Sequence, residues 1–175
     1  MVQKIYKQLQ SSLVKLVPEK WKKIVLYASC IDGRGGEMFF YYYPQKLFRV
    51  KPVNCYEIPD NFVVEEQVFN QKLKELYDVI KLLNHCTKLR WSNITIIIKK
   101  DEFKIEYHFE DLAHSRYTDD QRRAYWCYKY LDFPLEALSP QERYTVENYV
   151  EETNLKPKIY VESLRNSEIH NQILK

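Results

Sequence analysis

The sequence predicts an α+β fold in which helices pack on one face of an antiparallel sheet of about five strands. Two pairs of apolar, β-branched or aromatic segments are each joined by a short polar turn, which is typical of β-hairpins and therefore of antiparallel pairing. Four other segments carry apolar residues at steps of three and four, the spacing of amphipathic helices. Along the chain these segments follow the order α-β-β-β-α-β-β-α-α.

The chain begins with a helix, a hairpin and a weak strand. A helix is expected over residues 2–17, because apolar side chains recur there at helical spacing until Pro18 ends the pattern. Residues 24–31 are nearly all apolar, so we expect a strand that is buried on both faces. A glycine-rich turn leads into an aromatic strand over residues 38–43, and a weaker third strand lies within residues 46–57.

A long helix and a second hairpin follow. The period is helical from about residue 64 to residue 84. Residues 91–98 are apolar and β-branched, which predicts a strand, and a polar turn follows them. Residues 103–109 then alternate between apolar and polar side chains, so one face of this strand should be dry and the other exposed to water. The side chains predicted to face water are Lys104, Glu106 and His108.

Two capped helices close the predicted domain. A Thr-x-x-Gln capping box opens a helix over residues 118–131. A Ser-Pro-x-Glu capping box, with proline at the first helical position, opens another over residues 139–152. We therefore expect one α+β domain over residues 1–152, and a tail or loosely docked element over residues 153–175.

Composition excludes several classes of protein. The three glycines all lie between residues 33 and 36, so the chain has neither a Rossmann fingerprint nor a P-loop, and it has no GxSxG motif. The four cysteines form no CxxC pair, which favours reduced structural thiols over a zinc site or a disulfide framework. No apolar run approaches the roughly 20 residues that span a bilayer, and the N-terminus lacks a signal-peptide pattern. We expect a cytoplasmic protein with no metal, cofactor or membrane partner.

Charge is unevenly distributed, although the formal net charge is only +3. Residues 1–100 hold 17 Lys and Arg against 9 Asp and Glu, whereas residues 101–152 hold 6 against 13. An acidic surface repels nucleic acid and attracts basic protein partners. The candidate partner-binding carboxylates in this acidic block are Glu110, Asp111, Asp119, Asp120, Glu136, Glu142, Glu147, Glu151 and Glu152.

Several aromatic and acidic motifs follow one another over residues 2–134. They are the aromatic strand, an Ile-Pro turn at residues 58–59, an aromatic–acidic–Asp-Leu stretch at 107–112 and a Trp-x-Tyr-Lys-Tyr-Leu stretch at 126–131. The order of these motifs resembles that of the YezG-like immunity proteins of bacterial polymorphic toxin systems. The residues that carry the resemblance, which we interpret as structural, are Trp21, Tyr27, Trp91, Tyr107, Asp111, Leu112, Arg122, Trp126, Tyr128 and Tyr130.

This resemblance implies a binding protein rather than an enzyme. Such proteins are made beside a toxin, often a nuclease exported by a type VII secretion system, and they bind and suppress it in the producing cell. The resemblance thus implies a cognate protein toxin as partner and no catalytic residues. Nuclease inhibitors are commonly acidic overall, and this chain departs from that pattern at +3, so its acidic block would have to supply the contact.

Two other functions are alternatives. Asp60, Glu102 and Lys104 have the residue types of a metal-dependent nuclease, in which carboxylates hold Mg²⁺ and a lysine positions the attacking water. The basic N-terminal region predicts a nucleic-acid-binding module instead, or simply a solvated helix face. Its lysines are Lys4, Lys7, Lys15, Lys20, Lys22 and Lys23.

Two further features have chemical and structural interpretations. His108 and His114 flank Glu110 and Asp111, a combination able to bind metal or transfer protons. The structural interpretation is that Asp111 holds the loop before the next helix by accepting backbone N–H bonds. Cys127 is predicted to lie in the middle of a helix, where a packing role is expected.

Overall fold

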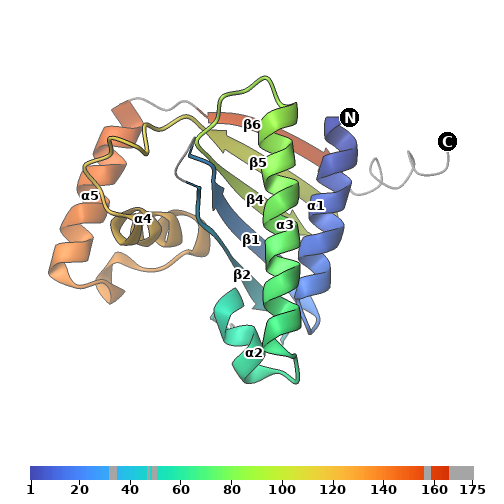
Figure 1. The fold of residues 1–175 in the computed structure, drawn as a ribbon. Helices are drawn as coiled ribbons and strands as arrows, with labels where there is room; N and C mark the ends of the chain where they lie inside the picture. Colours follow the sequence, from blue (N-terminus) through green and yellow to red (C-terminus); the bar gives the residue numbers. More distant parts are fainter. Residues whose placement is uncertain (32–34, 47, 49–50, 156–158, 166–175) are drawn as a thin grey trace. The chain divides into compact units, whose positions relative to one another are not determined.

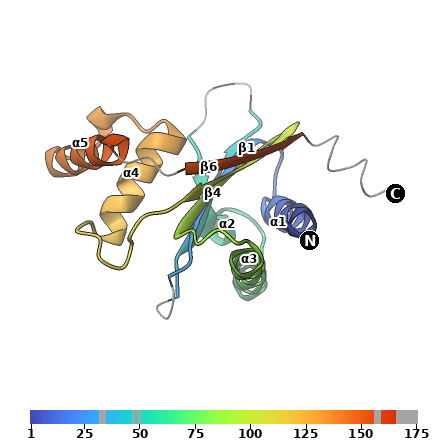
Figure 2. The same ribbon diagram turned by 90° about the horizontal axis from the view of Figure 1, so that it is seen from above.

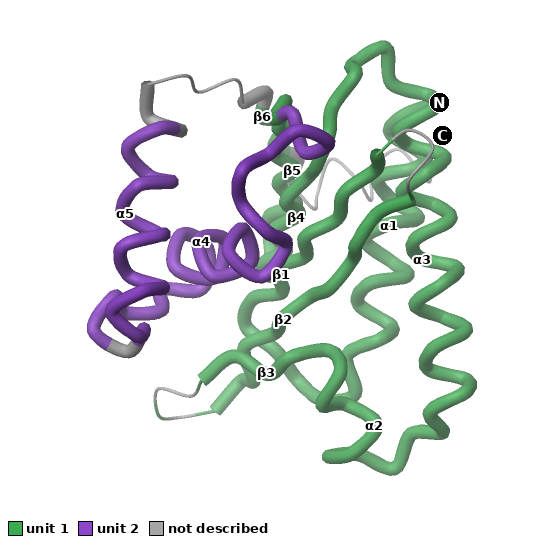
Figure 3. Tube along the Cα trace, turned by 60° about the vertical axis from the view of Figure 1, so that its left-hand side comes forward, with its two compact units in different colours: residues 1–110, 160–175 green, residues 111–159 purple. Residues whose placement is uncertain are grey.

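The computed structural model describes residues 1–31, 35–46, 48, 51–155 and 159–165. Its fold is α+β, as predicted, and it divides into two compact units (Figure 3). Unit 1 combines residues 1–110 with residues 160–175, and unit 2 consists of residues 111–159.

A six-stranded sheet runs through unit 1 in the order β3-β2-β1-β4-β5-β6 (Figure 1). The four pairings from β3 to β5 are antiparallel, so both predicted hairpins and the weak third strand are present. The sixth strand lies beside β5 and comes from the C-terminal stretch in which the sequence predicts no strand. The bounds are β1 Trp21–Ser29, β2 Met38–Pro44, β3 Val53–Asn54, β4 Asn93–Lys99, β5 Glu102–His108 and β6 Ile159–Arg165.

Two helices, α1 (Val2–Leu16) and α3 (Glu66–Cys86), pack side by side on one face of the sheet (Figure 2). The apolar stripe of α1 is buried while its lysines at positions 4 and 15 are exposed, which is the amphipathic pattern the sequence predicts. The predicted turn near residue 59 contains a short helix, α2 (Ile58–Asn61), after a 3-10 turn, η1 (Cys55–Glu57).

The main core fills the space between these helices and the sheet. It consists of alternate residues of the central strands, which are almost completely buried: Ile24, Leu26, Phe40, Tyr42, Ile94, Ile96, Ile98, Phe103, Ile105 and Tyr107. Tyr6 of α1 reaches across to β5, where its hydroxyl lies 2.7 Å from the hydroxyl of Tyr107. This pairing lets two buried tyrosines satisfy each other, because each hydroxyl can donate and accept.

The other face of β5 corrects a prediction. Alternation is present, but Glu106 and His108 are only 7% and 8% exposed, so the polar face is not a wet one. Glu106 forms an ion pair with Lys104, with 2.6 Å between Oε1 and Nζ. The Nε2 atom of His108 lies 4.0 Å from Oε2, the other carboxylate oxygen of Glu106. Their β4 neighbours Thr95 and Asn93 are also buried. Polar alternation therefore marks a second buried face, on which charge pairing offsets the cost of removing these groups from water.

Unit 2 contains α4 (Asp119–Leu131), a 3-10 turn η2 (Leu135–Ala137) and α5 (Pro140–Leu155). Both predicted capping boxes are confirmed: Thr118 exchanges hydrogen bonds with Gln121, and Ser139 does the same with Glu142. The two helices pack through aromatic side chains, with the ring of Tyr149 at 4.3 Å from that of Tyr125. The chain leaves α4 through Asp132, which has a left-handed backbone with φ of 55°.

Candidate partner-binding surface

An open, mainly apolar hollow of about 360 Å³ lies between the helices of unit 2. Tyr128 of α4, Leu135 of η2 and four residues of α5 line it: Val146, Glu147, Val150 and Glu151. Val146 is completely buried, Val150 is half-buried, and the two glutamates are exposed. We call this feature the α4–α5 groove.

Helix periodicity explains the composition of the groove. Val146 and Val150 are four residues apart, as are Glu147 and Glu151, so each pair lies one turn apart on one side of α5. A step of one residue turns a helix by about 100°, which places the glutamates next to the valines rather than on the opposite side. The groove therefore has an apolar floor and an acidic border.

Local contacts engage Asp111, Asp119, Glu142 and Glu152 among the predicted carboxylates. Asp111 accepts a bond from the backbone N–H of His114 at 3.1 Å and contacts its ring Nδ1 at 3.0 Å. Asp119 pairs with Arg122, and Glu152 with Arg116. Glu142 accepts from the backbone and hydroxyl of Ser139. These four stabilise loops and helix ends, which gives them a structural reason to be present.

The pKa values of two of these carboxyl groups reflect those contacts. The side chain and backbone of His114 lower the pKa of Asp111 by hydrogen bonding to its charged form. The hydroxyl and backbone N–H of Ser139 lower the pKa of Glu142 in the same way. Both groups remain ionised at neutral pH.

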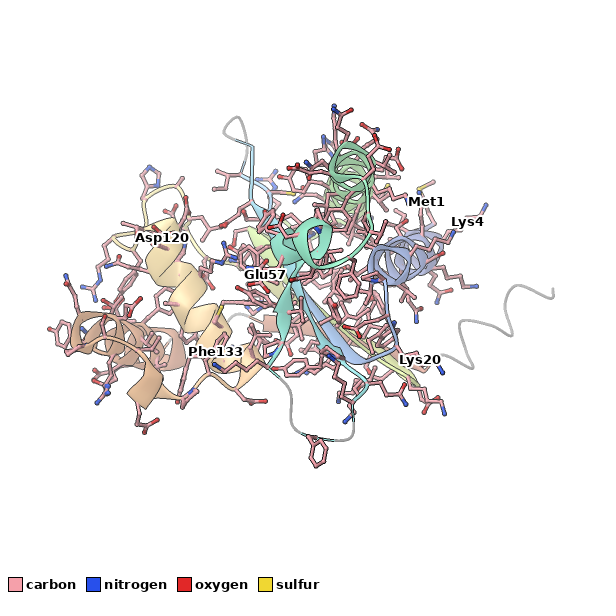
Figure 4. The ribbon with its side chains drawn as sticks, turned by 90° about the horizontal axis from the view of Figure 1, so that it is seen from below. Met1, Lys4, Lys20, Glu57, Asp120 and Phe133 are labelled. Atoms are coloured by element: carbon pink, nitrogen blue, oxygen red, sulfur yellow. The ribbon has the colours of Figure 1, made fainter. Side chains whose placement is uncertain are left out.

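The remaining predicted carboxylates differ in their placement. Glu110 lies in unit 1, where its backbone N–H donates to the Ser92 hydroxyl at 2.8 Å. Asp120 is exposed in the first turn of α4 (Figure 4), and Glu136 is exposed in η2. Among the described side chains, no Lys, Arg or His lies within ion-pair distance of Glu147 or Glu151.

The residues that carry the family resemblance lie mostly in packed positions. Trp91 is buried, and its indole N–H donates to the Thr87 hydroxyl at 3.1 Å. Tyr27 stacks on Phe39, and Leu112, Trp126 and Tyr130 are buried. Arg122 pairs with Asp119 and donates to the backbone carbonyl of Tyr117, while Trp21 is half-buried at the start of β1. Tyr128 differs, because its side chain lines the groove.

The structure does not bring the three candidate nuclease residues together on one element or on neighbouring strands. Asp60 lies in α2, which follows β3, whereas Glu102 and Lys104 lie on β5, with β2, β1 and β4 between those two strands in the sheet. Glu102 pairs with Lys99 at 3.0 Å, and Lys104 pairs with Glu106. Within the described ranges, no three His, Cys, Asp or Glu side chains are grouped so that they could hold a metal ion.

The other sequence candidates are also dispersed. His108 is buried on β5 in unit 1, whereas His114 is exposed in unit 2 against Asp111. Cys127 is half-buried within α4, away from the first turn. Of the basic residues, Lys4 projects from α1 away from the sheet (Figure 4), and Lys22 donates to the carbonyl of Lys46 at 2.9 Å.

Sequence reasoning missed the apolar half of the groove. Val146 and Val150 follow the helical period and suggest ordinary core residues, and Leu135 belongs to a 3-10 turn that the sequence does not predict. A usable signal was present on α5, where each valine is followed directly by a glutamate.

The chain is thus a small α+β protein whose helical unit carries an apolar groove with an acidic border. A family model described as "Immunity protein YezG-like" matches residues 2–151, so the chain belongs to the YezG-like immunity protein family. It is similar to Immunity protein YezG of Bacillus spizizenii, with 27% identity over 153 residues, which is 85% of this chain and 89% of that protein. It is also similar to Type VII secretion system protein EsaG of Staphylococcus aureus, with 27% identity over 165 residues, which is 85% of this chain and 93% of that protein.

Of the helices described, none is both long and apolar enough to cross a membrane. The 21-residue helix α3 has the length, but its sequence carries charged side chains throughout.

Proposed function

We propose that this chain binds a cognate protein toxin in the cytoplasm of the producing cell and suppresses it, without catalysing a reaction itself. Its membership of the YezG-like immunity protein family over residues 2–151 is the observation that carries the proposal. The name of the staphylococcal relative supports a toxin exported by a type VII secretion system. We infer further that the toxin is a nuclease.

The charge distribution supports a nuclease partner. A nuclease needs a basic surface to hold the DNA or RNA backbone, and an acidic surface on the inhibitor is complementary to it. In unit 2, Asp120, Glu136, Glu147 and Glu151 are exposed and enter no ion pair among the described side chains. These carboxylates would orient the encounter, while buried aromatic and apolar contacts would supply most of the affinity.

A plasmid-nicking assay with Mg²⁺ tests this function. The samples are this chain alone, the nuclease domain of the toxin encoded beside it, and the two at equimolar ratio. Loss of the toxin's cleavage in the mixture supports an immunity protein. Undiminished cleavage contradicts the assignment of this pair.

The same assay separates the enzymatic alternative. Cleavage by this chain alone, abolished by Lys104→Ala, would contradict the binding-protein proposal. It would support a Mg²⁺-dependent nuclease that uses Asp60, Glu102 and Lys104. A Lys20→Ala variant is a matched control, because it removes an exposed lysine outside that candidate set.

A further inference from the structure

The α4–α5 groove has two properties that the helices of unit 2 do not themselves explain. Its floor exposes part of Val150, Leu135 and Tyr128, although burial of apolar surface stabilises a protein by about 25 cal/mol per Å². Its border places Glu147 and Glu151 one turn apart, where like charges repel each other mildly. A partner with apolar side chains would cover the exposed apolar surface, and its basic side chains would offset the repulsion between the two glutamates.

The spacing of the border restricts the chemistry of such a partner. Residues four apart on a helix lie about 5–6 Å apart at their Cβ atoms. A partner helix with Lys or Arg residues one turn apart presents cations at the same spacing. Its apolar side chains can pack on Tyr128, Leu135 and Val150, which are partly exposed. The groove volume of about 360 Å³ accommodates a few side chains rather than a whole domain.

We propose that the α4–α5 groove is the docking site for a short amphipathic helix of the toxin. Apolar side chains of that helix enter between Tyr128, Leu135 and Val150, and its Lys or Arg side chains pair with Glu147 and Glu151. This inference rests on the proposed function, and it adds the place and the chemistry of the contact. The acidic border, to which a basic partner would be complementary, and the partly exposed apolar floor are the observations that support it.

Binding kinetics with the toxin domain test the proposal through two matched pairs of variants. Tyr128→Ala removes an aromatic side chain from the groove, whereas Tyr144→Ala removes one from an exposed position on α5 that does not line it. Glu147→Gln with Glu151→Gln removes the two border charges, whereas Glu65→Gln with Glu66→Gln removes two exposed charges at the start of α3, outside the predicted partner-binding set. Circular dichroism and the melting temperature report whether each variant is folded.

We expect the groove variants to dissociate faster. Tyr128→Ala should weaken Kd by about tenfold or more, mainly through koff, because buried aromatic residues dominate interface energies. The double Gln variant of the border should also weaken Kd by about tenfold, whereas Tyr144→Ala and the double Gln variant at positions 65 and 66 should each change it by less than about threefold. Equal effects of the groove and control variants would overturn the groove proposal.

Photo-cross-linking identifies the occupant without any loss of side-chain volume. A benzoylphenylalanine at position 128 should cross-link to a toxin segment rich in apolar and basic residues, and the same probe at position 144 should not. A product of two copies of this chain, or an internal product with its own residues 166–175, would overturn the proposal.

The two proposals fail in different ways. If the wild-type chain neutralises the toxin but position 128 gives no toxin cross-link and Tyr128→Ala binds normally, the groove proposal is wrong and the proposed function stands. If the wild-type chain neither binds nor inhibits the toxin, the proposed function itself is wrong.

Discussion

Gly36 lies where a side chain has no room, just before β2. A Cβ atom built there would lie 1.9 Å from the carbonyl oxygen of Ser29 and 2.3 Å from the hydroxyl of Tyr77. The first of these neighbours is backbone within the hairpin and cannot move without disturbing the sheet. The glycine therefore allows the close approach that joins the end of β1 to α3 through the Tyr77–Ser29 hydrogen bond of 3.0 Å.

We predict that Gly36→Ala lowers the free energy of unfolding by about 1–3 kcal/mol, the usual cost of forcing extra volume into a packed site. Urea unfolding measures the change. Ser11→Ala, at an exposed position of α1, is the control and should alter stability by less than about 0.5 kcal/mol. An unchanged midpoint in Gly36→Ala would mean that the hairpin end relaxes freely.

Half-buried Tyr77 and buried Tyr6 make stability sensitive to alkaline pH. Burial, and then the nearby Cys30 thiol, raise the pKa of Tyr77 to about 12. Burial also raises the pKa of Tyr6, and the hydrogen bonds that its hydroxyl forms with Glu162 and Tyr107 add to the effect. A group whose pKa is higher in the folded state stabilises the fold fully below its unfolded pKa, near 10, and loses that contribution as pH rises through the folded value.

We therefore predict that the free energy of unfolding falls between pH 10 and pH 12, the window set by the two pKa values of Tyr77. Urea unfolding at successive pH values measures the slope. Tyr77→Phe should reduce the slope, because phenylalanine cannot ionise, while losing the hydrogen bond to Ser29 at neutral pH. Equal slopes in both proteins would show that Tyr77 does not contribute.

At the scale of the element, α4 depends on its first turn. The Thr118 hydroxyl accepts from the N–H of Gln121, and the Gln121 side chain accepts from the N–H of Thr118. Two backbone donors that have no partner within the helix are satisfied in this way. The first turn also carries Asp119 and Asp120, which the helix dipole favours.

We predict that Thr118→Ala destabilises α4 by about 1 kcal/mol, the typical value of an N-cap. Hydrogen exchange of the α4 amides should rise about fivefold, since 1.4 kcal/mol corresponds to a factor of ten. Thr145→Ala on α5 is the matched control, because that threonine lies inside a helix, where its hydroxyl donates to the carbonyl of Gln141 and caps no helix end. Unchanged exchange in Thr118→Ala would indicate that packing alone holds the helix.

At the scale of the whole molecule, charge is separated along the chain. Residues 1–100 carry an excess of Lys and Arg, while residues 101–152 carry an excess of Asp and Glu. At physiological ionic strength the Debye length is about 8 Å, so a partner responds to the nearest patch rather than to the net charge. A weakly basic protein can therefore present an acidic binding surface.

We predict that Glu147→Lys with Glu151→Lys slows association with the toxin domain and flattens the dependence of kon on ionic strength. Stopped-flow measurements over a series of salt concentrations test this. Glu65→Lys with Glu66→Lys, at exposed positions at the start of α3, makes the same change of net charge on unit 1 and should have a smaller effect. Equal effects would mean that net charge, not the acidic border, governs association.

Much of the fold could be predicted because its signals are local. Helix periods, capping boxes and apolar strands depend on residues within a few positions of each other, and all the predicted helices and strands are present. The β6 strand could not be predicted in the same way, because a strand at the edge of a sheet is stabilised by pairing with distant residues. The prediction that His108 faces water was wrong for a related reason. Alternation shows which side chains share a face of a strand, but not whether that face is covered.

The sequence by itself determined the fold class, the capped starts of α4 and α5 and the family, because hydrophobic period, capping residues and motif order are all local features of the chain. Only the tertiary structure decided which acidic residues are already paired and which are not. Asp119, Glu142, Glu147 and Glu151 look alike in the sequence, yet two have local partners and two border an apolar groove. The physical reason is that a carboxylate's role depends on the atoms within about 4 Å of it, and folding brings most of those atoms from elsewhere in the chain.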